Sequence, residues 1–412
     1  MPRRILSASS AVSVGLCLGL ATILACSSSA DRNGFTEEPK AEGDAAAPPP
    51  ALGGDAANTL MVDVKLSGAV YAPNGSLPLS NALVYLATEK PAAIPAGAYC
   101  DECVKLQDGT FTVSAADGKF ELATQLPKGK VYLVVQKGQF RRVREIAIED
   151  AGDVDVSKDD TTLPGKPDPA KGDDTPKMVV LKDDTDFDPI DESLKKLGIT
   201  QFDVLEDRAL LEDETALMKY HVVFIPCGSE ADPKSTSPTA KANLQKYVES
   251  GGKLYVTDWS YEFVRQPFPG WITWDGETST VGSAATGDEW DAPATAVDQG
   301  LADWLAATGD ATFTVEGNWT TISSVNTMPG KDPKGAEVDI TPKVWVTGQK
   351  AGATRPTTVS FENQCGRVLF STYHTEGALG GSGSSALTAQ EKALLYVLLE
   401  VGVCVGDRPG VN

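Results

Sequence analysis

The residues best suited to chemistry in this sequence are one histidine and two carboxylates near the ends of strand-like runs. Asp258 ends the apolar run KLYVTD, His374 follows the run RVLFSTY, and Glu376 lies two residues further on. The carboxyl ends of neighbouring parallel strands meet at one edge of a sheet, so we expect Asp258 and His374 to face each other there. Together with Glu376, such a pair could activate a water molecule for hydrolysis.

Two other interpretations fit the same side chains. They could line a binding pocket, or His374 could be a structural residue that forms a hydrogen bond with a carboxylate. The sequence contains two histidines, His221 and His374, so a multi-histidine metal site is excluded.

Aspartates cluster between residues 183 and 188, where DTDFD has the alternate spacing of a calcium loop. The glycine and the distal glutamate of an EF-hand are missing. Solvated charge, with Asp188 capping a helix that begins beyond Pro189, is the simpler interpretation. We therefore predict no metal and no cofactor.

Six tryptophans fall within 61 residues, from Trp259 to Trp319. Aromatic side chains can stack on sugar rings, and they can equally fill a core beneath long loops. The candidates for ligand contact are Trp259, Tyr261, Trp271 and Trp274.

The cysteines predict two disulfides if the chain is exported to an oxidising compartment. Cys365 lies in a turn between two strands and Cys404 follows the last expected helix, so we predict that they pair. The closely spaced Cys100 and Cys103 lie in a proline-rich loop, where a local disulfide is favoured over a redox or metal role. Cys227 ends a buried strand and is expected to be a small core residue.

The first residues have the pattern of an export signal, with Arg3 and Arg4 before an uncharged apolar stretch that ends at Cys26. The run ILAC followed by serines resembles a bacterial lipobox. This resemblance implies that residues 1–25 are removed, that Cys26 is lipidated, and that the protein is held at the outer membrane of the cell envelope. The membrane is thus an expected partner. An uncleaved membrane helix is the alternative.

Residues 26–58 are small, charged or proline-rich and predict a disordered tether, and residues 151–176 predict a linker of the same kind. Between them, residues 59–150 contain short alternating strands and turns, as in an antiparallel β-sandwich. The segments LSGAVYAPNGSLPLSNALVYL and AADGKFEL resemble the carboxypeptidase regulatory-like, transthyretin-like family. The resemblance implies a seven-stranded sandwich that is normally not catalytic, with carbohydrate binding in some relatives.

Residues 177–406 alternate strands and helices, which predicts a doubly wound, flavodoxin-like α/β domain. The apolar, β-branched runs HVVFIP and KLYVTD are expected to be strands buried on both faces. The run TAQEKALLYVLLEVG predicts a final helix with a broad buried face.

The phrase YVESGGKLYVTD and the His374-x-Glu376 pair resemble class I glutamine amidotransferases, in which the histidine is the base and the glutamate orients it. The family's Gly-x-Cys-x-Gly nucleophile elbow is absent, because the corresponding place reads DWSYE from Asp258. A domain of this family without its nucleophile is degenerate.

The chain of 412 residues carries 57 acidic and 36 basic side chains, a net charge of −21. This balance argues against a nucleic-acid partner, because phosphate binding needs clustered Lys and Arg. The sequence favours a non-catalytic, lipid-anchored envelope protein that binds a glycan or an envelope protein. The alternative is an envelope hydrolase that uses Asp258, His374 and Glu376.

Overall fold

The structure, a computed structural model, describes residues 60–101, 104, 106, 109–185, 187–377 and 386–399. The chain divides into two compact units, Met1–Ala56 and Ala57–Asn412, and every described residue belongs to the second. The expected signal peptide (1–25), the lipidation site Cys26 and the whole predicted tether (26–58) lie outside the described residues. Within the described part of the chain, no helix is both long enough and apolar enough to span a membrane.

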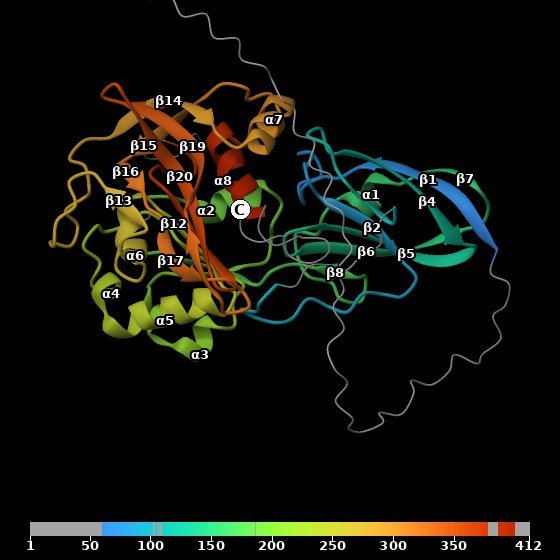
Figure 1. The fold of residues 1–412 in the computed structure, drawn as a ribbon, viewed down its shortest axis with the longest axis horizontal. Coiled ribbons are helices and arrows are strands. Elements are labelled where there is room, and N and C mark those ends of the chain that lie inside the picture. Colours follow the sequence, from blue (N-terminus) through green and yellow to red (C-terminus); the bar gives the residue numbers. More distant parts are fainter. Residues whose placement is uncertain are drawn as a thin grey trace, which may run out of the picture. The chain divides into compact units, whose positions relative to one another are not determined.

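The first half of the described chain forms two sheets (Figure 1). A three-stranded sheet has the order β4-β1-β7, with β1 antiparallel to β4 and parallel to β7. A five-stranded antiparallel sheet has the order β3-β2-β5-β6-β8. The bounds of these strands are Met61–Ala69 (β1), Leu83–Ala87 (β2), Phe111–Val113 (β3), Lys119–Pro127 (β4), Gly129–Lys137 (β5), Phe140–Ile148 (β6), Gly152–Asp155 (β7) and Asp173–Asp174 (β8).

Alternating apolar residues explain the burial of these sheets, because successive side chains of a strand point to opposite faces. In β4, Phe120 and Leu122 are buried and alternate with the exposed residues Lys119, Glu121 and Ala123. In β2, Val84 and Leu86 join the same hydrophobic cluster as Phe120, whereas Leu83 and Tyr85 belong to a separate cluster. The five-stranded sheet therefore has apolar contacts on both of its faces.

The prediction of a linker at residues 151–176 is wrong. This segment contains β7, the short helix α1 (Lys158–Thr161) and β8, all of which are attached to the two sheets. The hydroxyl of Thr161 donates to the carbonyl of Ala69 at 2.6 Å, and Arg142 forms an ion pair with Asp173 at 2.9 Å. Hydrogen bonds and ion pairs hold a segment whose polar composition resembles that of a linker.

The second half contains a nine-stranded mixed sheet of order β10-β9-β11-β12-β21-β20-β19-β14-β15 (Figure 1). The first five strands in this order are parallel to one another, and from β21 onward each pair of neighbours is antiparallel. The bounds are Met178–Leu181 (β9), Asp203–Leu205 (β10), Val222–Ile225 (β11), Lys253–Thr257 (β12), Trp290–Ala296 (β14), Phe313–Asn318 (β15), Lys343–Lys350 (β19), Ala353–Asn363 (β20) and Gly366–Ser371 (β21). The chain is a mixed α/β protein, as predicted. The doubly wound domain predicted for residues 177–406 implies a parallel sheet, but four of the nine strands are antiparallel.

Strands β11 and β12 are buried on both faces, as their apolar runs predict, whereas the edge strand β10 is largely exposed. Val222 and Phe224 of β11 contribute to one hydrophobic cluster, and Val223 and Ile225 contribute to another. Helices α2, α7 and α8 add to the first cluster, and α5 and α6 add to the second. The helical segments are Ile190–Lys196 (α2), Ala209–Glu212 (η1), Glu214–Leu217 (α3), Pro233–Thr236 (α4), Pro238–Glu249 (α5), Asp258–Tyr261 (η2), Glu262–Arg265 (α6), Gln299–Ala307 (α7) and Ala389–Leu399 (α8).

Two small antiparallel pairs complete the described elements. They join Ile272–Trp274 (β13) to Ile322–Val325 (β16) and Met328–Lys331 (β17) to Glu337–Ile340 (β18).

The disulfide predictions are wrong, because Cys100 is bonded to Cys365. The bond joins the loop after β2 to the turn between β20 and β21, at a sequence separation of 265 residues. Cys103 and Cys404, the partners predicted for these two cysteines, lie outside the described residues. Spacing along the chain suggested local partners, but the fold brings the two distant loops together.

Candidate functional site

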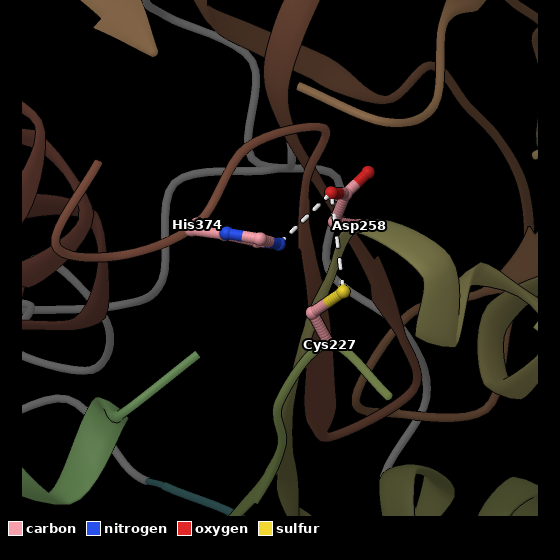
Figure 2. A group of neighbouring side chains, drawn as sticks. All are labelled: Cys227, Asp258 and His374. Atoms are coloured by element: carbon pink, nitrogen blue, oxygen red, sulfur yellow. Dashed lines mark hydrogen bonds and ion pairs between the residues drawn. The ribbon is translucent and has the colours of Figure 1, made fainter. Parts of the chain in front are cut away.

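Three side chains from distant parts of the sequence meet where three adjacent strands end (Figure 2). Cys227 lies two residues beyond β11, Asp258 follows β12 directly, and His374 lies three residues beyond β21. In the sheet, β12 lies between β11 and β21. The predicted meeting of Asp258 and His374 is confirmed, and Cys227 is an additional member.

The three groups are in close contact and almost fully enclosed. His374 Nε2 lies 3.3 Å from Asp258 Oδ2, and Cys227 Sγ lies 3.9 Å from the same oxygen. The exposed fraction is 2% for Cys227, 0% for Asp258 and 2% for His374. A buried charge of this kind needs compensating partners.

Asp258 is the first residue of the helical turn η2, where the chain turns sharply after β12. Its φ of +45° falls in the left-handed region, which aspartate tolerates better than most residues. The sequence indicated no tight elbow at this place, because it lacks flanking glycines. The elbow is present, but it carries a carboxylate instead of a nucleophilic thiol.

Hydrogen bonds fix the Asp258 carboxylate. The backbone N–H of Trp319 donates to both oxygens, at 3.0 and 3.1 Å, and the hydroxyl of Thr320 donates to Oδ1 at 3.0 Å. Burial raises the pKa of Asp258 to about 6, and His374 and these donors limit the rise. Burial alone would lower the pKa of His374, but the neighbouring Asp258 carboxylate raises it overall.

Glu376 does not orient His374, so this part of the predicted triad is wrong. Its carboxylate pairs with Lys196 of α2 at 2.8 Å, and the same ammonium group contacts Glu391 of α8 at 3.1 Å. His374 is placed instead by its backbone: its N–H donates to Gly317 and its carbonyl accepts from the Gln390 side chain. Glu376 thus belongs to an ion-pair cluster between helices.

A second carboxylate, Asp188, lies behind the site and was misinterpreted from the sequence as a helix cap. It is fully buried, and Thr375 donates to it from its backbone N–H at 2.8 Å and from its hydroxyl at 3.1 Å. The hydroxyl of Thr257 donates at 2.6 Å. Burial raises the pKa of Asp188, and the charge of His374 opposes the rise. Asp188 therefore ties the end of β12 to the segment that carries His374.

Cys227 is buried, as expected, but its sulfur belongs to the site. Its backbone N–H donates to Thr257 Oγ1 at 2.8 Å, which fixes the turn after β11. Burial raises the pKa of the thiol, and the charge of Asp258 acts in the same direction. In this environment the thiol is held in its protonated, weakly nucleophilic form. The position could have been found from the rule that placed Asp258, since Cys227 also follows a buried parallel strand.

A small pocket of about 60 Å³ opens beside these groups. Its lining consists of Phe187, Cys227, Trp259, Trp319 and His374. The two tryptophan rings pack edge to face at 5.3 Å, and Trp259 Nε1 donates to the Trp319 carbonyl at 3.0 Å. The volume suits an ion or a few water molecules rather than a sugar ring.

The other aromatic candidates fill the core. Tyr261, Trp271 and Trp274 are all buried. Trp271 stacks on Phe361 at 4.5 Å, and Tyr261 accepts a hydrogen bond from the Ala284 backbone. Of the four residues predicted to contact a ligand, Trp259 alone is among those that line the pocket.

Comparisons with known proteins identify no family. No family model matches the chain, and no curated protein matches it. Among solved structures, a cytoplasmic protein from Salmonella typhimurium is 13% identical with a TM-score of 0.33, and the match covers 54% of this chain and 97% of that one. PurLQS from Thermotoga maritima is 12% identical with a TM-score of 0.32, covering 54% and 98%.

A beta-galactosidase from Bacillus circulans sp. alkalophilus is 13% identical with a TM-score of 0.28, and the match covers 54% of this chain and 30% of the enzyme. The chain thus matches less than a third of that enzyme's length. Similarities at this level carry no functional conclusion, and the functional argument rests on the site itself.

Proposed function

We propose that the protein is a non-catalytic, lipid-anchored protein of the bacterial cell envelope, in which the α/β part serves as a binding module. The closed state of the Asp258–His374 site carries this proposal. A hydrolase must bring a substrate carbonyl or acetal within reach of its base, but both groups are at most 2% exposed. The adjoining pocket of about 60 Å³ is too small for a peptide or a glycan.

The proposed family relationships are consistent with this role. The two N-terminal sheets share the hydrophobic cluster that a regulatory-like β-sandwich needs between its layers. If the five parallel strands are numbered as they occur along the chain, their order across the sheet is 2-1-3-4-5. This is the order of a flavodoxin-like or amidotransferase-like sheet. A degenerate domain of this kind keeps the scaffold and loses the nucleophile.

The binding partner is proposed to be an envelope protein rather than a glycan. Glycan recognition usually presents exposed aromatic faces, whereas Trp271 and Trp274 are buried in the core. The strongly acidic composition favours a partner with basic patches.

The alternative, an envelope hydrolase, is supported by the contact between Asp258 and His374 at 3.3 Å. Screening the purified mature protein against activated esters, amides and glycans separates the two functions. We expect the parent protein to turn over these substrates no faster than the His374→Ala variant does. His221→Ala is the matched control for the loss of a histidine. Turnover that is lost in a folded His374→Ala protein and kept in His221→Ala would establish the hydrolase instead.

The anchor is tested separately at Cys26. The Cys26→Ser variant should lack lipid and should accumulate as an unprocessed precursor, because the lipidated cysteine is needed before signal cleavage. Metabolic labelling with a fatty acid and gel mobility report both effects. Normal processing and membrane association of Cys26→Ser would contradict the proposed anchor.

A further inference from the structure

We propose that Cys227, Asp258 and His374 form a binding site for a Zn²⁺ ion, with a fourth coordination position that opens into the adjoining pocket. This inference goes beyond the proposed envelope function and holds whether or not the chain is lipid-anchored.

The chemistry of the donor set favours zinc. A thiolate, an imidazole nitrogen and a carboxylate oxygen are the three ligand types that zinc prefers in proteins. Calcium and magnesium select oxygen ligands only, so the Cys227 sulfur disfavours both. Three protein ligands with one open position is the arrangement of zinc sites that hold water or a small anion.

The spacing of the donor atoms is close to what a tetrahedral ion requires. Zinc bonds of about 2.0 Å to nitrogen or oxygen and about 2.3 Å to sulfur place the ligand atoms about 3.3–3.5 Å apart. His374 Nε2 and Asp258 Oδ2 are 3.3 Å apart, and Cys227 Sγ is 3.9 Å from Asp258 Oδ2. All three donors lie within 4.8 Å of one another. The sulfur must therefore move closer to the other two donors to complete the geometry.

His374 supplies a second, independent observation. Nδ1 is buried without a hydrogen-bond partner among the described residues, and Nε2 meets Asp258 without forming a well-aligned hydrogen bond. The imidazole is 2% exposed and lines the pocket, so bulk water does not satisfy it. A metal ion bound to Nε2 would give this nitrogen the partner that the protein does not provide.

The surroundings orient the ligands as a metal site requires. Thr320 Oγ1 donates to Oδ1 of Asp258, so Oδ2 faces Cys227 and His374 (Figure 2). Thr257 Oγ1 accepts from the Cys227 backbone N–H and donates to Asp188. Hydrogen bonds thus orient both the Asp258 carboxylate and the Cys227 backbone.

The charges also balance. On binding, the Cys227 thiol loses its proton to solvent and the sulfur forms a bond to the ion. The thiolate and the Asp258 carboxylate then carry two negative charges, which the dication neutralises inside a closed site. The Cys100–Cys365 disulfide leaves Cys227 as the one free cysteine among the described residues, so its sulfur is available as a ligand.

Cobalt titration of the chelator-treated mature protein tests the site, because Co²⁺ bound to a thiolate gives a near-ultraviolet charge-transfer band. One equivalent of Co²⁺ should produce this band together with the visible spectrum of a four-coordinate ion, and one equivalent of Zn²⁺ should abolish both. Cys227→Ser should lose the band, and His374→Gln should weaken Zn²⁺ binding at least about tenfold. His221→Gln and the double variant Cys103→Ser/Cys404→Ser should match the parent.

The proposal would be wrong if the parent protein gave no Co²⁺ spectrum. It would also be wrong if folded Cys227→Ser and His374→Gln gave the same spectrum as the parent. If either variant fails to fold, X-ray absorption on the zinc-loaded parent decides. We expect one sulfur neighbour at about 2.3 Å and nitrogen or oxygen neighbours at about 2.0 Å. A first shell without sulfur would refute the role of Cys227.

Discussion

Asp258 illustrates how a fully buried carboxylate is kept in a folded protein. Its oxygens accept from one backbone N–H and one hydroxyl, and the His374 imidazole lies 3.3 Å from Oδ2. These partners offset the cost of burial and hold the carboxylate in one orientation, with Oδ2 toward His374 and Cys227. The residue is therefore better described as a fixed acceptor than as a free base.

His221 provides the clearest pH dependence at the residue scale. Its Nδ1 accepts from the Lys177 backbone N–H at 2.7 Å, and its Nε2 contacts the Pro95 carbonyl at 2.8 Å, which requires a neutral ring protonated at Nε2. Burial lowers the pKa of His221 below its ordinary value of 6.5, and the hydrogen bond to Pro95 only partly opposes this.

On acidification the unfolded chain therefore binds a proton at His221 before the folded chain does, so folding stability is lost as the pH falls below about 6.5. His221→Gln should cost about 1–2 kcal/mol near neutral pH through its lost hydrogen bonds. That cost should shrink at acid pH. Urea unfolding of both proteins at about pH 7.5 and about pH 5 measures the difference in their free energies of unfolding. A difference that is larger at pH 5 than at pH 7.5 would contradict the prediction.

The candidate site could be predicted in part. The rule that parallel strands end at one edge placed Asp258 and His374 together. Asp188 was missed because an aspartate before Pro189 has the ordinary pattern of a helix cap. Cys227 ends a buried strand, which is an ordinary place for a small core residue, so the sequence did not indicate that its sulfur belongs to the site. No local pattern separates a buried, bonded aspartate from a solvated one.

At the scale of elements, the short turns between β19, β20 and β21 are the sequence feature that indicates antiparallel strands in this part of the sheet. Strands β19 and β20 are joined through Ala351 and Gly352, and β20 and β21 through Gln364 and Cys365. Ala351, Gly352 and Gln364 all have positive φ, as tight hairpin turns require. A two-residue loop cannot carry a parallel crossover, so loop length could have corrected the predicted topology.

The tryptophan-rich region should behave as core rather than as a ligand platform. Trp274 is buried and lies 5.8 Å from the ring of Phe370 and 5.5 Å from that of Tyr261. Trp274→Ala should therefore lower the free energy of unfolding by about 3–5 kcal/mol, as expected for a large core cavity. Trp259→Ala, at the partly exposed pocket wall, serves as the control and should cost less. A loss below about 1 kcal/mol for Trp274→Ala, measured by urea unfolding, would refute the core assignment.

At the scale of the whole molecule, the β-rich part and the α/β part of the described unit are joined by specific contacts. The Cys100–Cys365 bond is accompanied by an ion pair between Asp101 and Lys253 at 3.0 Å. Trp304 Nε1 of α7 donates to the Pro78 carbonyl at 2.8 Å. Composition indicated two domains on a flexible linker, but it could not reveal pairings that form only in three dimensions.

The disulfide closes a loop of 265 residues, so its loss should be costly. The chain-entropy model gives roughly 5 kcal/mol for a loop of this size. Cys365→Ser should therefore unfold at lower denaturant concentration than the parent, and peptide mass under non-reducing conditions should show Cys100 joined to Cys365. Recovery of Cys365 joined to Cys404, or of Cys100 joined to Cys103, would contradict the fold at this point.

The central claim is that three strand ends form a closed, ion-sized site rather than a substrate cleft. Anomalous diffraction at the zinc absorption edge, from crystals of the zinc-loaded protein, tests it most directly. The account predicts one strong peak between Cys227 Sγ, Asp258 Oδ2 and His374 Nε2, with no substrate-sized channel leading to it. An empty site, or an open channel that exposes Asp258 and His374 to solvent, would contradict it.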